Sequence, residues 1–314
     1  MTAQNIDLLN LAQNVDAAEL VDMTETQTGG GKSRGLLPTG TAFVRLSGYI
    51  EYGNHAGEFE GKKKDPALEF RLLFTVVGGV GVNLAGEEEN FVGDDGYCPV
   101  IQTYDTKQTR FERSKAVAIF NAVNVAPKGT HFVNKLGQLY TLQIGVKKHK
   151  KTGKDIQDID FTALQPAIDP MTRKPYVQYL DKDNNPQPLR ELTPDDVKVF
   201  LWNKPTHVTW EQYGAMWDSI EIKGEWAEKR DEKTGAIIEK AKSKNFMQIK
   251  CQQALNFAGS SLEQLLETRG ITVDIASLEA SESPDAEPED THEESETVTA
   301  PPADDVLTAP PADV

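Results

Sequence analysis

The sequence contains few of the residues that cross-link a chain or anchor it in a membrane. Cys98 and Cys251 are the only cysteines among 314 residues, which excludes a disulfide framework and favours a reducing compartment. The longest apolar stretch, at about residues 74–86, is interrupted by glycines and is far shorter than the ~20 residues of a membrane helix. The N-terminal residues carry Asp7 where a signal peptide would carry Lys or Arg. We therefore expect no secretory targeting, no membrane partner and a cytoplasmic location.

Signals for catalysis and cofactor binding are also scarce. The five histidines and two cysteines show none of the spacings of transition-metal sites, and no G-x-S-x-G motif or dinucleotide-binding glycine pattern follows a predicted strand. The run GGGKS, ending at Ser33, has Thr26 where a phosphate-binding loop has its first glycine, so a solvated linker is favoured. An enzyme that uses dispersed carboxylates and magnesium is an alternative, but acids such as Asp155 and Asp158 are more typical of a solvated strand face. We expect no enzyme, no cofactor and no metal.

Basic residues are absent from the C-terminal end of the chain. Residues 279–314 contain twelve acidic residues and neither Lys nor Arg. They therefore hold −12 of the net charge of −16, and the first 278 residues hold −4. The segment contains several prolines and no aromatic residue, so it cannot bury enough apolar surface to offset the entropy of ordering. The sequence predicts a disordered acidic tail at 279–314.

Three segments after residue 40 alternate apolar and polar residues with the period of a β-strand. The first begins near residue 41; one predicted face holds Val44, Leu46 and Ile50, and the other holds Phe43, Arg45 and Tyr49. The second covers residues 68–77, with Arg71 opposite the apolar face, and the third covers 138–148, with a partly basic polar face. These patterns predict half-buried antiparallel strands.

Helical spacing is confined to shorter stretches. Residues 113–124 have apolar residues at i, i+3, i+4 and i+7, the spacing of a helix with one apolar face. Thr209 and Gln212 form a capping box for a second helix. Residues 247–266 contain two more helices, the last of which is capped by Ser260. A glycine turn near residue 153 predicts a β-hairpin, and residues 166–196 form an irregular excursion. The fold class that fits is mainly β (α+β): a partly open, oligonucleotide-binding (OB)-like β-barrel with a few peripheral helices, although a sandwich would give a similar pattern. We expect an N-terminal arm and Gly-rich linker at 1–40, this body at 41–278, and the tail.

The body carries two ingredients for binding a single-stranded polyanion. Such strands are held by cations that follow the phosphates and by aromatic rings on which bases stack. The cations expected to bind phosphates are Arg45, Lys62, Lys63, Lys64, Arg71, Lys147, Lys148, Lys150, Lys151 and Lys154, and the rings expected to stack bases are Phe43 and Tyr49. Lysines at hairpin tips also serve solubility, and either ring could instead pack beneath a loop.

The four tryptophans lie in the C-terminal half of the body. Trp202, Trp210 and Trp217 belong to one strand and helix unit, which we expect them to anchor to the barrel. Trp226 follows Lys223 and a glycine in a loop-like context, and it is the tryptophan expected to be exposed.

The acidic tail suggests a regulatory role. Twelve negative charges on a flexible segment can occupy a cationic groove in place of phosphates, so nucleic acid must displace them before it binds. The released tail would then be available to partner proteins. A tail that only keeps the protein soluble is the simpler alternative.

Four blocks of sequence carry a resemblance to a known family. FVRLSGYIEYG, FLWNKPTHVTW, EIKGEW and KSKNFMQIKCQQALNFAGSSLEQLL, spread over about residues 41–266, resemble single-stranded DNA-binding proteins of tailed bacteriophages. The resemblance implies an OB-type barrel, no catalysis, a role in phage DNA replication or recombination in the cytoplasm of the infected host cell, and an acidic tail that contacts phage replication proteins. Tails of this kind commonly end in an aromatic residue, whereas none follows Phe257 here.

The predicted function is therefore sequence-independent binding and protection of single-stranded DNA. RNA is an alternative ligand, because stacking and phosphate contacts do not read the sugar. A virion structural or interaction protein with a merely solubilising tail is the alternative from another class, and the near-neutral body is compatible with it.

Overall fold

The computed structural model describes residues 35–59, 62–63, 65–125, 128–150, 152–230, 237–239 and 242–271. The predicted acidic tail and most of the predicted N-terminal arm and linker lie outside these residues. Lys64 and Lys151, both predicted to bind phosphates, also lie outside them.

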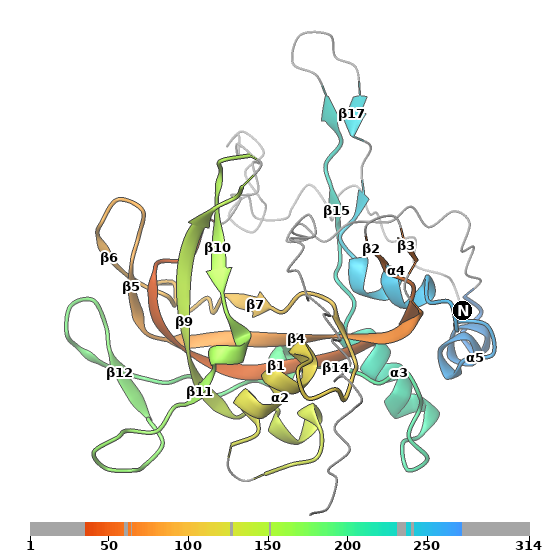
Figure 1. The fold of residues 1–314 in the computed structure, drawn as a ribbon, viewed down its shortest axis with the longest axis horizontal. Helices are drawn as coiled ribbons and strands as arrows, with labels where there is room; N and C mark the ends of the chain where they lie inside the picture. Colours follow the sequence, from red (N-terminus) through yellow and green to blue (C-terminus); the bar gives the residue numbers. More distant parts are fainter. Residues whose placement is uncertain are drawn as a thin grey trace, which may run out of the picture.

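A curled sheet of eight strands forms the centre of the protein (Figure 1). Its main path runs β10-β9-β1-β4-β7, with β11 paired to β9, β14 to β1 and β8 to β4. The bounds are β1 Gly40–His55, β4 Ala67–Gly78, β7 Val100–Gln102, β8 Thr106–Lys107, β9 Leu139–Lys148, β10 Asp155–Ile159, β11 Gln165–Pro166 and β14 Lys198–Phe200. The pairing of β1 with β14 is parallel and the other pairings in this sheet are antiparallel. The predicted mainly β fold with a partly open, barrel-like sheet is confirmed.

The described part of the chain also contains five two-stranded ribbons. They are β2 Glu58–Phe59 with β3 Lys62–Lys63, β5 Val80–Val82 with β6 Glu88–Asn90, β12 Gln178–Leu180 with β13 Pro186–Pro188, β15 Glu225–Trp226 with β18 Lys242–Ser243, and β16 Lys229–Arg230 with β17 Ile237–Glu239. Figure 1 shows β9–β10 and the β15–β18 and β16–β17 ribbons projecting from the same side of the sheet.

The predicted helices are present, and three of those described begin at a Ser or Thr N-cap. Four α-helices occur in the described part of the chain, namely α2 Lys115–Val123, α3 Trp210–Ser219, α4 Phe246–Gln252 and α5 Ser261–Thr268, with shorter 3-10 turns at η2 Phe132–Lys135, η3 Phe161–Ala163 and η4 Pro194–Asp196. The hydroxyls of Ser114, Thr209 and Ser260 each accept a hydrogen bond from a backbone N–H in the first turn of α2, α3 and α5, which satisfies donors that a helix start leaves unpaired. None of these helices is long and apolar enough to cross a membrane, as far as the chain is described.

Two hydrophobic cores share the long strands β1 and β4. The first core packs β1, β4 and β9 against α2 and includes Val44, Phe74 and Ile119. The second core packs the same two strands and β14 against α3, α4 and α5, and includes Ile50 and Trp217. Both faces of β1 and β4 are therefore covered along part of their length, so a polar residue on either face can be buried.

A β-bulge in β1 changes which residues share a face. Leu46 pairs with Phe74 and Gly48 pairs with Leu73, so the intervening residue of β1 has no counterpart on β4. An extra residue in one strand inverts the alternation beyond it. As a result Tyr49 joins the first core and Ile50 the second, and the predicted faces are wrong for these two residues.

Candidate nucleic-acid interface

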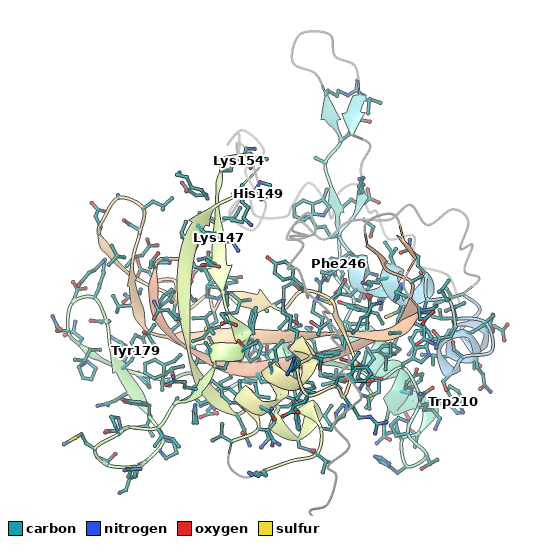
Figure 2. All side chains as sticks on the ribbon, in the orientation of Figure 1. Lys147, His149, Lys154, Tyr179, Trp210 and Phe246 are labelled. Atoms are coloured by element: carbon teal, nitrogen blue, oxygen red, sulfur yellow. The ribbon has the colours of Figure 1, made fainter. Side chains whose placement is uncertain are left out.

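The β9–β10 hairpin carries the largest group of the predicted phosphate-binding cations that the structure describes. Its turn is closed by hydrogen bonds from His149 N to Lys154 O at 2.8 Å and from Gly153 N to His149 O at 2.9 Å. Gly153 has a φ of 67°, a left-handed conformation that glycine adopts without steric cost. The predicted hairpin is confirmed, and Figure 2 shows Lys147 and Lys154 on this projecting arm.

Four lysines of this hairpin are exposed, namely Lys147, Lys148, Lys150 and Lys154. Lys147 pairs with Asp158 at 3.4 Å and Lys148 pairs with Asp155 at 2.9 Å across the two strands. Ion pairs in solvent contribute only about 0–1 kcal/mol each. A phosphate can therefore compete for both lysines, although the two carboxylates remain nearby and oppose its approach.

The ring of Phe43 is half-buried against the irregular excursion. It meets Tyr176 edge-on, with ring centroids 5.2 Å apart, and lies 6.4 Å from the ring of Tyr179. These aromatic contacts fix the excursion against β1. A base could reach Phe43 only along its remaining exposed surface.

Arg45 binds protein groups with all three of its guanidinium nitrogens. Nε donates to Arg190 O at 2.9 Å, Nη1 donates to Gly137 O at 2.9 Å, and Nη2 pairs with Glu191 at 2.5 Å. Holding loops against β1 is thus its role in this structure, and a phosphate would have to displace these partners.

Tyr49 lies in the first core rather than on an exposed face. Its exposed fraction is 0%, its ring stacks on Phe132 at 5.8 Å, and its hydroxyl donates to Glu51 at 2.8 Å. Burial, together with the Glu51 carboxylate, raises the pKa of Tyr49. The prediction that this ring stands beside Phe43 and Arg45 is wrong, because the bulge in β1 turns it inward.

Arg71 is buried as well, because the C-terminal helices cover its side of β4. It is 5% exposed, pairs with Asp105 at 2.7 Å and donates to Gln102 at 3.2 Å. Its guanidinium also lies over the rings of Phe246, 5.1 Å from the centroid, and Tyr52, at 5.8 Å. A solvent-facing phosphate contact is therefore not available to Arg71 in this structure.

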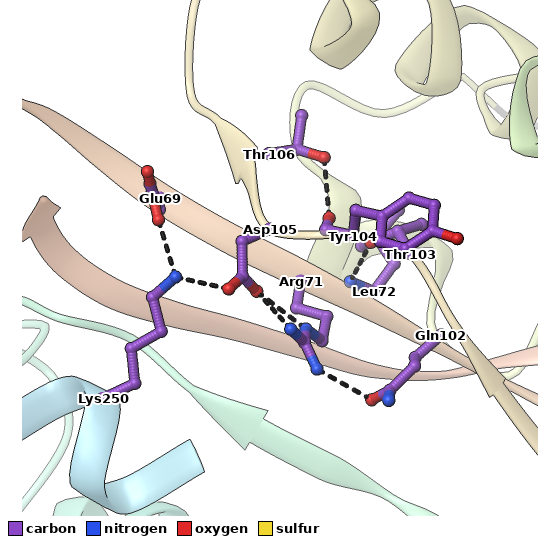
Figure 3. A network of polar contacts seen from close by, with 9 residues as sticks. All are labelled: Glu69, Arg71, Leu72, Gln102, Thr103, Tyr104, Asp105, Thr106 and Lys250. Atoms are coloured by element: carbon purple, nitrogen blue, oxygen red, sulfur yellow. Dashed lines mark hydrogen bonds and ion pairs between the residues drawn. The ribbon is translucent and has the colours of Figure 1, made fainter. Parts of the chain in front are cut away.

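The ion pairs of Arg71 extend into the C-terminal helices, as Figure 3 shows. Lys250 of α4 pairs with Asp105 and, at 2.7 Å, with Glu69 of β4. Removing one partner from such a mostly buried set would leave the others uncompensated. The network therefore fixes α4 against β4.

The remaining predicted lysines lie on the β2–β3 ribbon. Lys62 and Lys63 form β3, paired with β2 in antiparallel register.

Exposed aromatic rings occur at other positions than Phe43 and Tyr49, the two rings predicted to stack bases. Among the described residues, Phe111, Trp226, Trp210 and Tyr104 are the exposed aromatic side chains. Cations lie over three of these rings: Lys244 over Trp226 at 4.8 Å, Lys204 over Trp210 at 5.2 Å and Lys115 over Tyr104 at 5.3 Å. The loop-like sequence around Trp226 predicted its exposure.

Of the three tryptophans predicted to anchor their unit, two are buried. Trp202 and Trp217 are in the second core, whereas Trp210 is 41% exposed. It occupies the first position of α3, where its ring points to solvent while Tyr213 and Trp217 on the following turns face the core. The prediction for Trp210 is wrong.

The described residues contain no group of three or more His, Cys, Asp or Glu side chains arranged to hold a metal ion. Cys98 and Cys251 are both buried as free thiols, and burial raises the pKa of Cys251 well above its usual value. No family model, curated protein or solved structure matches this chain.

Proposed function

We propose that the protein binds single-stranded DNA without sequence preference, as a non-catalytic protein of phage DNA replication or recombination. The observation that carries the proposal is the β9–β10 hairpin, on which Lys147, Lys148, Lys150 and Lys154 are exposed on one projecting arm of a curled sheet. Lysine is a point charge on a flexible stem, so it neutralises phosphates without reading base edges.

Single strands are favoured over duplex by the exposed rings. A base in a duplex is already stacked and paired, whereas an unpaired base can stack on an aromatic side chain, at about 1–3 kcal/mol per base. Trp226 is half-exposed, and the ammonium of Lys244 lies 4.8 Å from its ring centroid. Where a ring and a cation are neighbours, a base can stack on the ring while the adjoining phosphate contacts the cation.

The acidic tail supports the regulatory part of the proposal through its charge alone. Its twelve carboxylates exceed the four exposed lysines of the hairpin, so the tail could occupy the hairpin in place of DNA. Displacement of the tail by DNA would make it available to replication proteins.

Binding titrations of the full chain test the proposal. We expect fluorescence anisotropy to show tighter binding to labelled oligo-dT than to a duplex of equal length. Changing Lys148, Lys150 and Lys154 to Glu should weaken oligo-dT binding by about a hundredfold in 0.1 M salt, if each contributes one phosphate contact.

A matched control distinguishes the loss of the hairpin site from the change in net charge. Lys128, Lys174 and Lys182 are exposed on other loops, and their change to Glu alters the net charge equally. Equal losses in both variants, or no preference for oligo-dT, would contradict the proposal.

A virion interaction protein is the second candidate, favoured by exposed apolar residues on the excursion. Ile168, Met171, Val177 and Leu180 all lie there, and Met171 is 89% exposed. Such a run on one excursion is typical of a protein contact surface. This candidate predicts no oligo-dT preference and no effect of the hairpin substitutions.

A further inference from the structure

The second projecting arm is a β-ribbon with an exposed tryptophan near its base. β15 pairs with β18, and β16 with β17 further along. Trp226 of β15 lies opposite Lys242 of β18, so both side chains are on one face of the ribbon. Lys244 is two residues from Lys242, and its Nζ lies 4.8 Å from the Trp226 ring centroid. One face of the arm thus combines an indole with two ammonium groups.

The cations of this face differ from those of the β9–β10 hairpin. Within the part of the chain that the structure describes, Lys242 and Lys244 have no carboxylate at ion-pair distance, whereas Lys147 and Lys148 are paired with Asp158 and Asp155. A phosphate would therefore meet these two ammonium groups without displacing a described carboxylate.

Trp210 provides a comparison, because it also has a lysine over its ring. There the Nζ of Lys204 donates to Val208 O at 2.6 Å and to Pro205 O at 3.3 Å, so backbone oxygens already take up its hydrogen bonds. The Trp210 ring also meets the edge of Tyr213 at 6.0 Å. This pair is satisfied internally, whereas the described residues provide no such backbone acceptor for the Nζ of Lys244.

The base of the ribbon is held in place by backbone and side-chain contacts. Lys244 N donates to Gly224 O at 3.0 Å, and Ile222 N donates to Asn245 Oδ1 at 3.1 Å, so the two ends of the ribbon are joined. Phe246 follows directly and packs under the guanidinium of Arg71. Trp226 therefore stands on a fixed base, which lowers the entropy cost of ordering a ligand there.

We infer that Trp226, Lys242 and Lys244 form a nucleotide-binding site, in which a base stacks on the indole and the adjoining phosphate contacts the two ammonium groups. The inference rests on the proposed single-stranded DNA binding and gives it a second point of contact, because this ribbon and the β9–β10 hairpin project from the same side of the sheet (Figure 1).

Titration of the full chain with labelled oligo-dT tests the site. Trp226→Ala should raise Kd roughly tenfold, since one stacked base is lost, and Trp226→Phe should restore most of the affinity because a ring remains. Trp210→Ala is the matched control and should leave Kd unchanged. Intrinsic fluorescence should also be quenched by oligo-dT in Trp210→Phe but not in Trp226→Phe, since Trp202 and Trp217 are buried.

A second variant makes the test independent of the ring. Lys242→Gln with Lys244→Gln should reduce the slope of log K against log salt by about 1.4, at ~0.7 per phosphate contact. If the wild-type chain binds oligo-dT and these variants bind it with the same affinity and the same salt slope, the ribbon site is overturned and the proposed function still stands. Absence of oligo-dT binding by the wild-type chain would overturn both.

Discussion

Neutralising the two carboxylates of the β9–β10 hairpin should tighten single-stranded DNA binding. Asp158 and Asp155 lie 3.4 and 2.9 Å from Lys147 and Lys148, so each remains near any phosphate that these lysines bind. At ~6 Å in water, one such charge opposes a phosphate by about 0.7 kcal/mol. Screening at 0.1 M salt, where the Debye length is about 10 Å, reduces the sum for two charges to about 0.8 kcal/mol. The double variant Asp155→Asn, Asp158→Asn should therefore lower Kd roughly fourfold.

Anisotropy titration with labelled oligo-dT in 0.1 M salt measures this effect. The substitutions remove two exposed ion pairs, which costs at most about 1 kcal/mol each, so the hairpin should stay folded. Asp183→Asn with Asp195→Asn is the control, because both carboxylates are exposed and lie outside the hairpin, on the β12–β13 turn and in η4. An unchanged or higher Kd in the hairpin variant, or equal tightening in the control, would refute the reasoning.

Three further outcomes follow from the charges and the packing. A chain ending at Leu278 should bind oligo-dT more tightly than the full chain, because twelve competing carboxylates are removed, and an unchanged Kd would show that the tail does not compete. Gly53→Ala should lower the free energy of unfolding, measured in urea, by more than about 2 kcal/mol. Gly53 has a φ of 86°, and an added Cβ would lie 2.6 Å from Ala254 Cβ and 2.7 Å from Trp202 Cη2. A smaller loss would mean that the backbone of β1 shifts to accommodate the methyl group. Burial lowers the pKa of His55 in the folded protein. The neutral imidazole should therefore contribute fully to the free energy of unfolding above about pH 6.5, and this contribution should be lost as the pH falls toward the pKa of His55 in the folded protein. A His55→Asn variant whose free energy of unfolding depends on pH as that of the wild type does would contradict this.

Features encoded by neighbouring residues were predictable from the sequence. The β9–β10 hairpin follows from period-two strands around a glycine turn, and the starts of α3 and α5 follow from Thr209 and Ser260 as N-caps. Such local signals do not depend on how distant segments pack.

The misassigned site residues depend on distant packing. Tyr49 is turned inward by a bulge that appears only in the pairing of β1 with β4, and Arg71 is buried because helices about 140 or more residues later in the chain cover its face. Arg45 is occupied by groups from Gly137 and residues 190–191. Alternation identifies opposite faces of a strand, but it does not reveal whether the polar face meets water.

The salt dependence of oligo-dT affinity tests the central claim most directly. Cations that bind phosphates release counterions from the strand, so log K should decrease linearly with log salt. If about five of the exposed lysines on the two arms contact phosphates, the account predicts a slope of about −3.5 for the full chain. A slope near zero would contradict the account.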